Sequence, residues 1–480
     1  RTLLPTQTPV CPYKDTTARL SLAIMDEIAS GVSKILGHVD TESVKQLTLA
    51  VVTVVVLWKL ARALMAEAIP RIEVTVTPME RAHLLETSTY VPGEKNLPGE
   101  VPCYDPGTMQ SLGTVPAMTP QEVVERVERA KAAQKIWAKS SFSTRRKLLK
   151  TFLRYILDNQ ELICRVAARD SGKPMVDAAF GEVLVTCEKI KWLVNCGEQY
   201  LKPEKRQPGY MMMHKVARVE YKPIGVMGCI VPWNYPFHNV FNPLVANLFA
   251  GNAIAIKTSE YASWSTGLYG RIIHAGLEAV GAPTDLVQII TGYGDAGNAL
   301  VTSGVGKVVF VGSTGVGKKV MESAAAKLTP VVLELGGKDP FIVCDDADLN
   351  QLLPFAMRGT FQSMGQNCTG AERFLVQEGI YDRFVEAVVS QCKQMRVGAA
   401  LGDEFVDCGA LCMPGHSKHV QALVDDAVAK GAKVLTGGQL PPAGTKGQFY
   451  PPTVIRDVDS SMRIMHEEVL QRVALSSVID

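Results

Sequence analysis

From residue 225 onward, short apolar runs alternate with longer stretches whose apolar positions recur at helical spacing. Runs of this kind, bounded by turn-forming residues, are typical of strands that are buried on both faces. They occupy residues 226–231, 253–256, 286–290, 308–311, 331–333 and 341–343. Strands that alternate with helices predict an α/β fold, in which helices cover both faces of a parallel sheet. Because ligands of such sheets bind beyond the carboxyl ends of the strands, the residues after each run are the first candidates for a site.

The stretch before these strands is predicted to be helical. Thr119 precedes a proline and is followed three positions later by Glu122, which is the signature of a capping box at a helix start. The apolar positions that follow fall on one helical face: Val123, Val127, Ala130 and Trp137. Further amphipathic helix is predicted as far as about residue 195, with an interruption at residues 170–174.

The first hundred residues have a different character. Apolar residues at helical spacing between Leu20 and Ile35 predict an amphipathic segment within residues 1–46. Residues 47–58 carry no charge, and the segment 47–65 reaches the length of a transmembrane helix if Lys59 and Arg62 extend their charged ends to the interface. A buried core helix or strand is the alternative. We expect a single-pass membrane anchor, with the part after it in the cytoplasm. Prolines, glycines and charges then predict a linker over residues 66–95.

Composition limits the classes of function. A chain of 480 residues has room for two or three domains, and its net charge of +2 without a basic block gives no sign of nucleic-acid binding. The 11 cysteines are scattered without a CxxC pair, and Cys408 and Cys412 have no histidine at zinc-site spacing. We therefore expect reduced thiols and no metal site.

Three motifs follow predicted strands. The glycine-rich turn that begins at Gly312 and Ser313 would present backbone N–H groups to a phosphate, although glycines also close ordinary turns. Lys257 and Glu260 have the chemistry to hold ribose hydroxyls; a surface turn is the alternative. Asn234, in the segment PWNYPF, offers an amide donor for an oxyanion, whereas most loop asparagines only form turns.

The segments GQNCTG and LELGGK contain the two residues with the clearest chemical potential. Cys368 lies among small and amide residues between glycines, and Glu334 lies 34 residues earlier in a glycine-rich turn. Cysteine thiolate is a strong nucleophile, and a glutamate within reach of one water can act as its general base. Taken singly, the cysteine would be a small buried hydrophobe and the glutamate a partner in a salt bridge.

Together, PWNYPF, KTSE, FVGSTGVG, LELGGKDP and GQNCTG resemble the aldehyde dehydrogenase superfamily over residues 95–468. The run PWNYPFHNVFNPL, with SEYASWS and GAERF, is most similar to the membrane-associated family 22 enzymes of plants and green algae. The resemblance implies a Rossmann-like NAD-binding domain over residues 96–335, with an oligomerisation hairpin at 205–223, and a catalytic domain over 336–480. It also implies a homodimer or higher oligomer, and a location in the endoplasmic reticulum or another secretory compartment.

The resemblance also implies roles for single residues. Cys368 would attack an aldehyde to give a thiohemiacetal, with Asn234 stabilising the oxyanion, and Glu334 would activate the water that hydrolyses the resulting thioester. Because Glu260 would face the ribose 2′-hydroxyl, NAD is expected rather than NADP. The expected cofactor-binding residues are Lys257, Glu260, Gly312, Ser313, Trp233 and Glu468. The candidates for the aldehyde pocket are Tyr235, Phe237, Asn367 and Thr369.

After Glu468 the sequence leaves the family pattern. Residues 469–473 replace an aromatic residue, a glycine and a proline, so we expect an incomplete catalytic domain and slow hydride transfer. A membrane-anchored binding or scaffold protein is the alternative function. Transfer of the acyl group to coenzyme A is a third reading of the same fold, and Glu334 argues against it because that route must suppress attack by water.

Overall fold

The computed structural model describes residues 41–64, 68–91, 98–468 and 473–479. The chain divides into two units, residues 1–69 and residues 70–480. In the first unit the structure describes helix α2 (Thr41–Leu64), whereas most of the predicted amphipathic segment 1–46 lies outside the described residues. Within the described ranges, no helix combines the length and the apolar character that a membrane crossing requires. The predicted anchor at 47–65, and the membrane location inferred from it, are therefore not supported.

Residues 70–91, which were predicted to belong to a linker, lie in the second unit. Ile72 and Val74 pack against its main core, and helix α3 (Pro78–Arg81) begins with a capping box formed by Thr77 and Glu80. The buried guanidinium of Arg169 donates hydrogen bonds to backbone carbonyls at the end of this helix. The prediction of a linker was wrong here because prolines and charges were interpreted as solvated loop, while the capping signature went unnoticed.

The second unit contains a five-stranded parallel sheet in the order β7-β6-β5-β8-β9. Five of the six predicted runs form it: β5 (Val226–Ile230), β6 (Ala253–Lys257), β7 (Val287–Ile290), β8 (Lys307–Gly312) and β9 (Val331–Leu335). All five residues of β6 are buried, as expected for a strand covered on both faces. The strand order reverses direction at β5, whose neighbours are β6 and β8. A crevice at the carboxyl ends of these strands is the usual ligand site of such a sheet.

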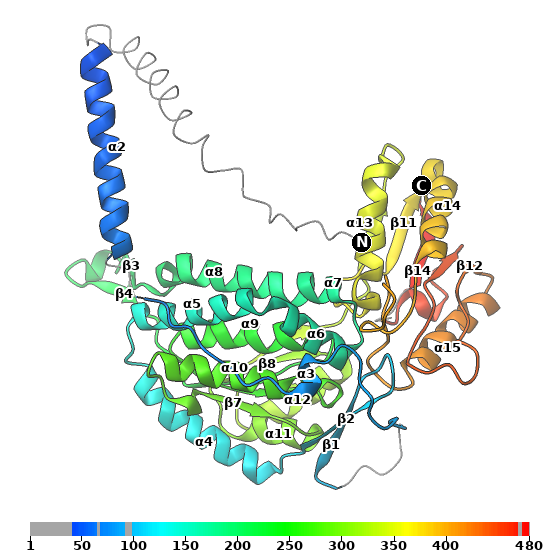
Figure 1. Ribbon diagram of the computed structural model, residues 1–480, viewed down its shortest axis with the longest axis horizontal. Coiled ribbons are helices and arrows are strands. Elements are labelled where there is room, and N and C mark those ends of the chain that lie inside the picture. The colour runs from blue at the N-terminus through cyan, green and yellow to red at the C-terminus, as the bar shows by residue number, and fades with distance from the viewer. Residues whose placement is uncertain (1–40, 65–67, 92–97, 469–472, 480) are drawn as a thin grey trace, which may run out of the picture. The chain divides into compact units, whose positions relative to one another are not determined.

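Helices cover both faces of this sheet (Figure 1). One face is covered by α4 (Pro120–Trp137), α11 (Gly294–Thr302) and α12 (Thr314–Ala325). The other is covered by α9 (Pro236–Phe249) and α10 (Thr266–Ala279), with α5 (Phe142–Asp158), α6 (Gln160–Ser171) and α8 (Val185–Cys196) packed behind them. The capping box predicted at Thr119 and Glu122 is present, and the predicted apolar face of α4 is buried. The α/β fold is therefore confirmed.

The sixth run, β10 (Pro340–Val343), belongs to a second sheet in the order β10-β11-β14-β13-β12. Its other strands are β11 (Arg373–Gln377), β12 (Lys433–Thr436), β13 (Thr453–Arg456) and β14 (Val473–Ile479). Helices α13 (Leu349–Phe361), α14 (Glu378–Gln394) and α15 (His416–Ala429) lie in the same part of the chain (Figure 1). Strand β14, which follows the point where the sequence leaves the family pattern, pairs in parallel with β11 and β13.

Among its described residues, the second unit also contains two antiparallel strand pairs. Strands β1 (Glu100–Tyr104) and β2 (Ser111–Pro116) form one of them. Strands β3 (Glu204–Arg206) and β4 (Ala217–Val219) form the other, in the region of the predicted hairpin. The role of this hairpin in oligomerisation stays a prediction.

Candidate active site

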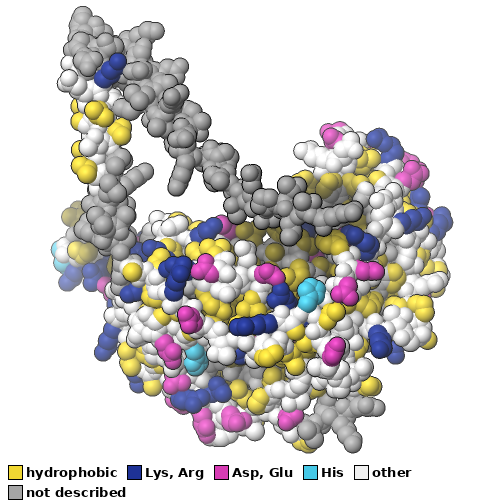
Figure 2. Space-filling model, viewed as in Figure 1, with side chains coloured by type: hydrophobic (Ala, Val, Ile, Leu, Met, Phe, Trp, Pro, Cys, Tyr) yellow, Lys and Arg dark blue, Asp and Glu magenta, His cyan; other side chains and the backbone are white. Residues whose placement is uncertain are grey.

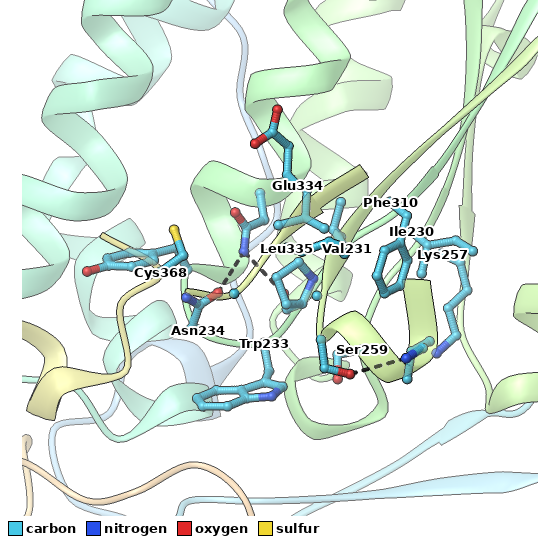
Figure 3. A pocket seen from close by; sticks show the side chains of 18 of the residues that line it. Ile230, Val231, Trp233, Asn234, Lys257, Ser259, Phe310, Glu334, Leu335 and Cys368 are labelled. Atoms are coloured by element: carbon cyan, nitrogen blue, oxygen red, sulfur yellow. Dashed lines mark hydrogen bonds between the residues drawn. The ribbon is translucent and has the colours of Figure 1, made fainter. Parts of the chain in front are cut away.

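A cavity of about 1150 Å³ opens at the carboxyl ends of β5, β6, β8 and β9 and reaches the loop before β11 (Figure 3). All nine residues predicted to act in catalysis or to bind the cofactor line it: Trp233, Asn234, Lys257, Glu260, Gly312, Ser313, Glu334, Cys368 and Glu468. Seven of them lie at or just after the ends of strands of the first sheet, whereas Cys368 and Glu468 lie in loops before strands of the second sheet. The structure therefore brings the predicted residues together, while the role of each remains to be tested.

Cys368 is exposed to the cavity at the end of an unusual turn. The short helix η6 (Gln362–Gly365) contains two non-glycine residues with left-handed backbone, Ser363 at φ 49° and Met364 at φ 62°. Such conformations cost energy and persist only where the surroundings hold them. Here Met364 is fully buried, and the Ser363 N–H donates a hydrogen bond to the buried Asp177 carboxylate over 2.8 Å. The turn that presents the cysteine is thus fixed by its packing.

The surroundings of Cys368 disfavour the thiolate form of its side chain. Partial burial raises its pKa above the usual value of a cysteine. The negative charges of Glu468, Asp339 and Glu334 raise this pKa further, against the opposing effect of a backbone hydrogen bond. Because the thiolate is the nucleophile, attack requires either a base or a positive charge brought close to the sulfur.

Asn234 has a defined amide orientation. Its side-chain oxygen accepts a hydrogen bond from the Asn239 amide over 3.2 Å, and its side-chain nitrogen donates to the backbone carbonyl of Gln366 over 3.1 Å. Gln366 lies two residues before Cys368, so the donor end of the amide is directed at the cysteine loop. A buried donor in this position is suited to stabilise an oxyanion on a carbonyl attacked by Cys368.

Glu334 lies near the end of β9, opposite Val311 of β8. Its side chain is exposed, and in Figure 3 its carboxylate is not directed at the Cys368 sulfur. The general-base role therefore remains a prediction.

Glu468 packs against the turn after β9. Its carboxylate occupies the space that a Cβ on Gly336 would need, and it accepts a hydrogen bond from the Gly337 N–H. The next residue, Lys338, forms an ion pair of 2.6 Å with Glu372 in the loop that follows Cys368. These contacts connect the end of the first sheet to the cysteine loop.

The other end of the cavity fits a dinucleotide. Lys257, buried at the end of β6, lies 3.2 Å from the carboxylate of Glu260. Ser313 lines the cavity, and its hydroxyl accepts the Val316 N–H at the start of α12. This helix therefore begins at the cavity, and a helix N-terminus is a favourable place for a pyrophosphate. A Cβ on Gly312 would lie 2.7 Å from the Phe310 ring, so the glycine permits a close turn at this point. Among the described residues there is no cluster of potential metal ligands.

Of the candidates for the aldehyde pocket, Tyr235, Asn367 and Thr369 line the cavity, but Phe237 does not. Phe237 is fully buried and stacks on Phe241 in the main core, with ring centroids 4.3 Å apart. Its assignment to the pocket was wrong because the residue begins the apolar face of α9.

Sequence reasoning missed three residues that support the site: Asn239, Lys173 and Glu182. Asn239 lies in the first turn of α9, and its amide donates a hydrogen bond to the Asn234 side-chain oxygen. Lys173 and Glu182 form a buried ion pair beneath the Asn234 loop. The only sequence feature that could have indicated this ion pair is Lys173 itself, in the break between helices at residues 170–174. A lysine in such a break is more often solvated.

The family model described as "Aldehyde dehydrogenase family" matches residues 91–475. A putative aldehyde dehydrogenase-like protein of Schizosaccharomyces pombe is 41% identical over 376 residues, which are 78% of this chain and 72% of the relative. A similarly named protein of Saccharomyces cerevisiae is 42% identical over 401 residues, which are 80% of this chain and 62% of the relative. The solved NAD⁺ complex of an aldehyde dehydrogenase from Bacillus cereus has a TM-score of 0.75 at 28% identity and covers 85% of this chain and 82% of that one. The finer resemblance to plant and green-algal enzymes is not shown by these matches.

Proposed function

The chain belongs to the aldehyde dehydrogenase family, whose enzymes depend on NAD(P), and from this membership we propose that it oxidises an aldehyde to a carboxylic acid with NAD. One observation carries the proposal: the cysteine, the asparagine and the glutamate predicted to act in catalysis line the same cavity as the residues predicted to bind the cofactor. The exposed thiol of Cys368 is the only one of the described free cysteines that lines this cavity.

In the proposed reaction, Cys368 gives its proton to solvent water, and the resulting thiolate sulfur forms a bond to the aldehyde carbon. The carbonyl π electrons move to the oxygen, and the Asn234 amide and the Cys368 N–H donate hydrogen bonds to the resulting oxyanion. NAD, when bound, supplies the acceptor for the hydride that leaves this carbon, and a thioester on Cys368 remains. Glu334 then takes a proton from water, the water oxygen attacks the thioester, and the C–S bond breaks to release the acid and the thiolate.

The preference for NAD rests on Glu260. Its carboxylate lines the cavity beside Lys257, at the position where an acidic residue accepts the ribose 2′-hydroxyl in nucleotide-binding sheets. A 2′-phosphate would bring negative charge to the same place. We therefore expect a higher kcat/KM with NAD than with NADP.

The test is NADH formation by the purified chain with a long-chain aldehyde, with NAD or NADP, and with or without coenzyme A. The proposal predicts turnover with NAD that does not need coenzyme A and yields the free acid. Strict dependence on coenzyme A would show acyl transfer instead of hydrolysis. Absence of any reduced cofactor with several aldehydes would contradict the proposed oxidation.

A further inference from the structure

Lys173 is buried directly beneath the loop that carries Asn234. It lies between α6 and the short helix α7 (Met175–Ala178), and only 1% of its surface is exposed. Its ammonium group donates hydrogen bonds to the Glu182 carboxylate and to the backbone carbonyl of Asn234, each over 2.5 Å. A buried ammonium group that is held by both partners fixes the carbonyl it contacts more firmly than a solvated one would.

Glu182 fixes the other side of the same loop. It lies in the π-helical segment η1 (Ala179–Leu184) and is fully buried. One of its oxygens accepts from Lys173, and the other accepts from the N–H of His238 in the first turn of α9 over 2.8 Å. The ion pair therefore holds the chain at residue 234 and again at residue 238.

Tyr235 completes the arrangement. Its ring lies 4.1 Å from the Lys173 ammonium, and Gly181 has no room for a Cβ because the same ring stands there. The backbone of the loop is thus held by the lysine below it, the glutamate beside it and the packed ring. Because the Cα–Cβ bond of Asn234 follows from its backbone, this arrangement determines where the amide can reach.

Neither member of the pair lines the cavity, whereas Asn234 and Tyr235 do. Direct contact with a substrate is therefore not their role. We infer that Lys173, held by Glu182, is a positioning residue for the oxyanion: it fixes the Asn234 peptide so that the side-chain amide meets the oxygen of the attacked carbonyl. The inference rests on the proposed function of Cys368 and Asn234. Removing one oxyanion donor typically lowers kcat by about 100- to 1,000-fold, and a displacement of about 1 Å is sufficient to lose much of that.

The test is a double-mutant cycle. In the wild-type background, Lys173→Met is expected to lower kcat for aldehyde oxidation by about 10- to 100-fold, while the dissociation constant for NAD changes less than about twofold. In an Asn234→Ala background the same substitution should lower kcat by less than about threefold, because the amide that it positions is already gone. The matched control is Lys191→Met, which breaks an exposed ion pair with Glu188 on α8 and should leave kcat unchanged. An equal loss in both backgrounds would overturn the inference and show a general structural effect.

A second variant and a second assay separate a loss of positioning from misfolding and from failure of the proposed oxidation. Where Lys173→Met does not fold, the cycle is made with Glu182→Gln, which keeps an acceptor for the His238 N–H and removes only the charge; the same non-additivity is expected. Each variant is also assayed for ester hydrolysis without cofactor, which needs Cys368 and the oxyanion donor but no hydride transfer. Ester hydrolysis without NADH formation would contradict the proposed oxidation while the cycle on esterase rates still tests Lys173. A cycle that is additive in the esterase assay would overturn the inference alone.

Discussion

The carboxylate of Glu468 stands where a side chain on Gly336 would have to lie. The two residues are 132 positions apart in the sequence and belong to segments associated with different sheets. The carboxylate also accepts a hydrogen bond from the next residue, Gly337, and lies close enough to Cys368 to raise the pKa of its thiol. Position 336 must therefore be a glycine because the Glu468 carboxylate packs against it. The local sequence around Gly336 does not indicate this contact.

Gly336→Ala should weaken NAD binding by about 10- to 100-fold. The new methyl group would displace the Glu468 carboxylate, which is predicted to bind the cofactor. NAD would then lose a hydrogen bond to a charged group, which costs about 1.5–3 kcal/mol of binding free energy. Calorimetric titration with NAD measures the change. Gly267→Ala is the control, because its methyl group would meet only the end of the Arg271 side chain at 3.5 Å. Unchanged binding by Gly336→Ala would show that Glu468 does not contact the cofactor.

Glu468→Gln should lower the pKa of the Cys368 thiol. A negative charge near a thiol raises its pKa because it opposes formation of the thiolate, so removing that charge shifts the ionisation to lower pH. The rate of Cys368 alkylation by iodoacetamide, measured against pH, should therefore rise at lower pH in the variant than in the wild type. The neighbouring Glu467→Gln, which breaks a surface pair with Arg463, should leave the profile in place. A profile of Glu468→Gln that is unshifted, or shifted to higher pH, would refute this electrostatic account.

Thr119→Ala should destabilise the second unit by about 1 kcal/mol. The Thr119 hydroxyl accepts the N–H of Glu122 at the start of α4, and the loss of a cap of this type typically has that cost. Urea unfolding gives the difference in free energy. Thr302→Ala, which removes hydrogen bonds only to the Asn298 and Ala299 carbonyls of its own helix, should change stability by less than about 0.5 kcal/mol. Equal effects of the two substitutions would show that the capping box does not stabilise the fold.

Glu334→Gln should separate the two halves of the reaction. An amide cannot accept the proton of the attacking water, so the thioester on Cys368 would persist after the hydride has left. Rapid mixing should then show a burst of NADH followed by little steady turnover. Loss of the burst together with the steady state would mean that Glu334 is also needed before hydride transfer, for example to deprotonate the thiol.

The sequence predicted the strands of the first sheet well because their burial on both faces leaves continuous apolar runs, and β5 to β9 follow those runs within one or two residues. The candidate site was identified as a set through the resemblance to aldehyde dehydrogenases, and most of its residues follow a strand or lie in a glycine-bounded loop. The buried position of Phe237 was also within reach, since Phe237, Phe241, Leu244 and Leu248 share one face of α9. This helical spacing places Phe237 in the core, and it is a stronger indication than the closeness of Phe237 to Asn234 in the sequence.

Other features depend on contacts between distant segments. The position of β14 between β11 and β13 is set by pairing across long stretches of chain, for which local pattern gives no signal. The position of Lys173 also depends on contacts with distant segments. Its charge predicts a solvated residue in a helix break, and only the folded chain shows that Glu182 and the Asn234 carbonyl surround it.

The most direct test of the central claim is NADH formation by two matched cysteine variants. Cys368→Ala removes the exposed thiol in the cavity, while Cys344→Ala removes another exposed thiol that does not line it. With a long-chain aldehyde and NAD, we expect Cys344→Ala to match the wild type and Cys368→Ala to lose both aldehyde oxidation and ester hydrolysis while still binding NAD. Appreciable aldehyde turnover by Cys368→Ala would contradict the assignment of Cys368 as the nucleophile.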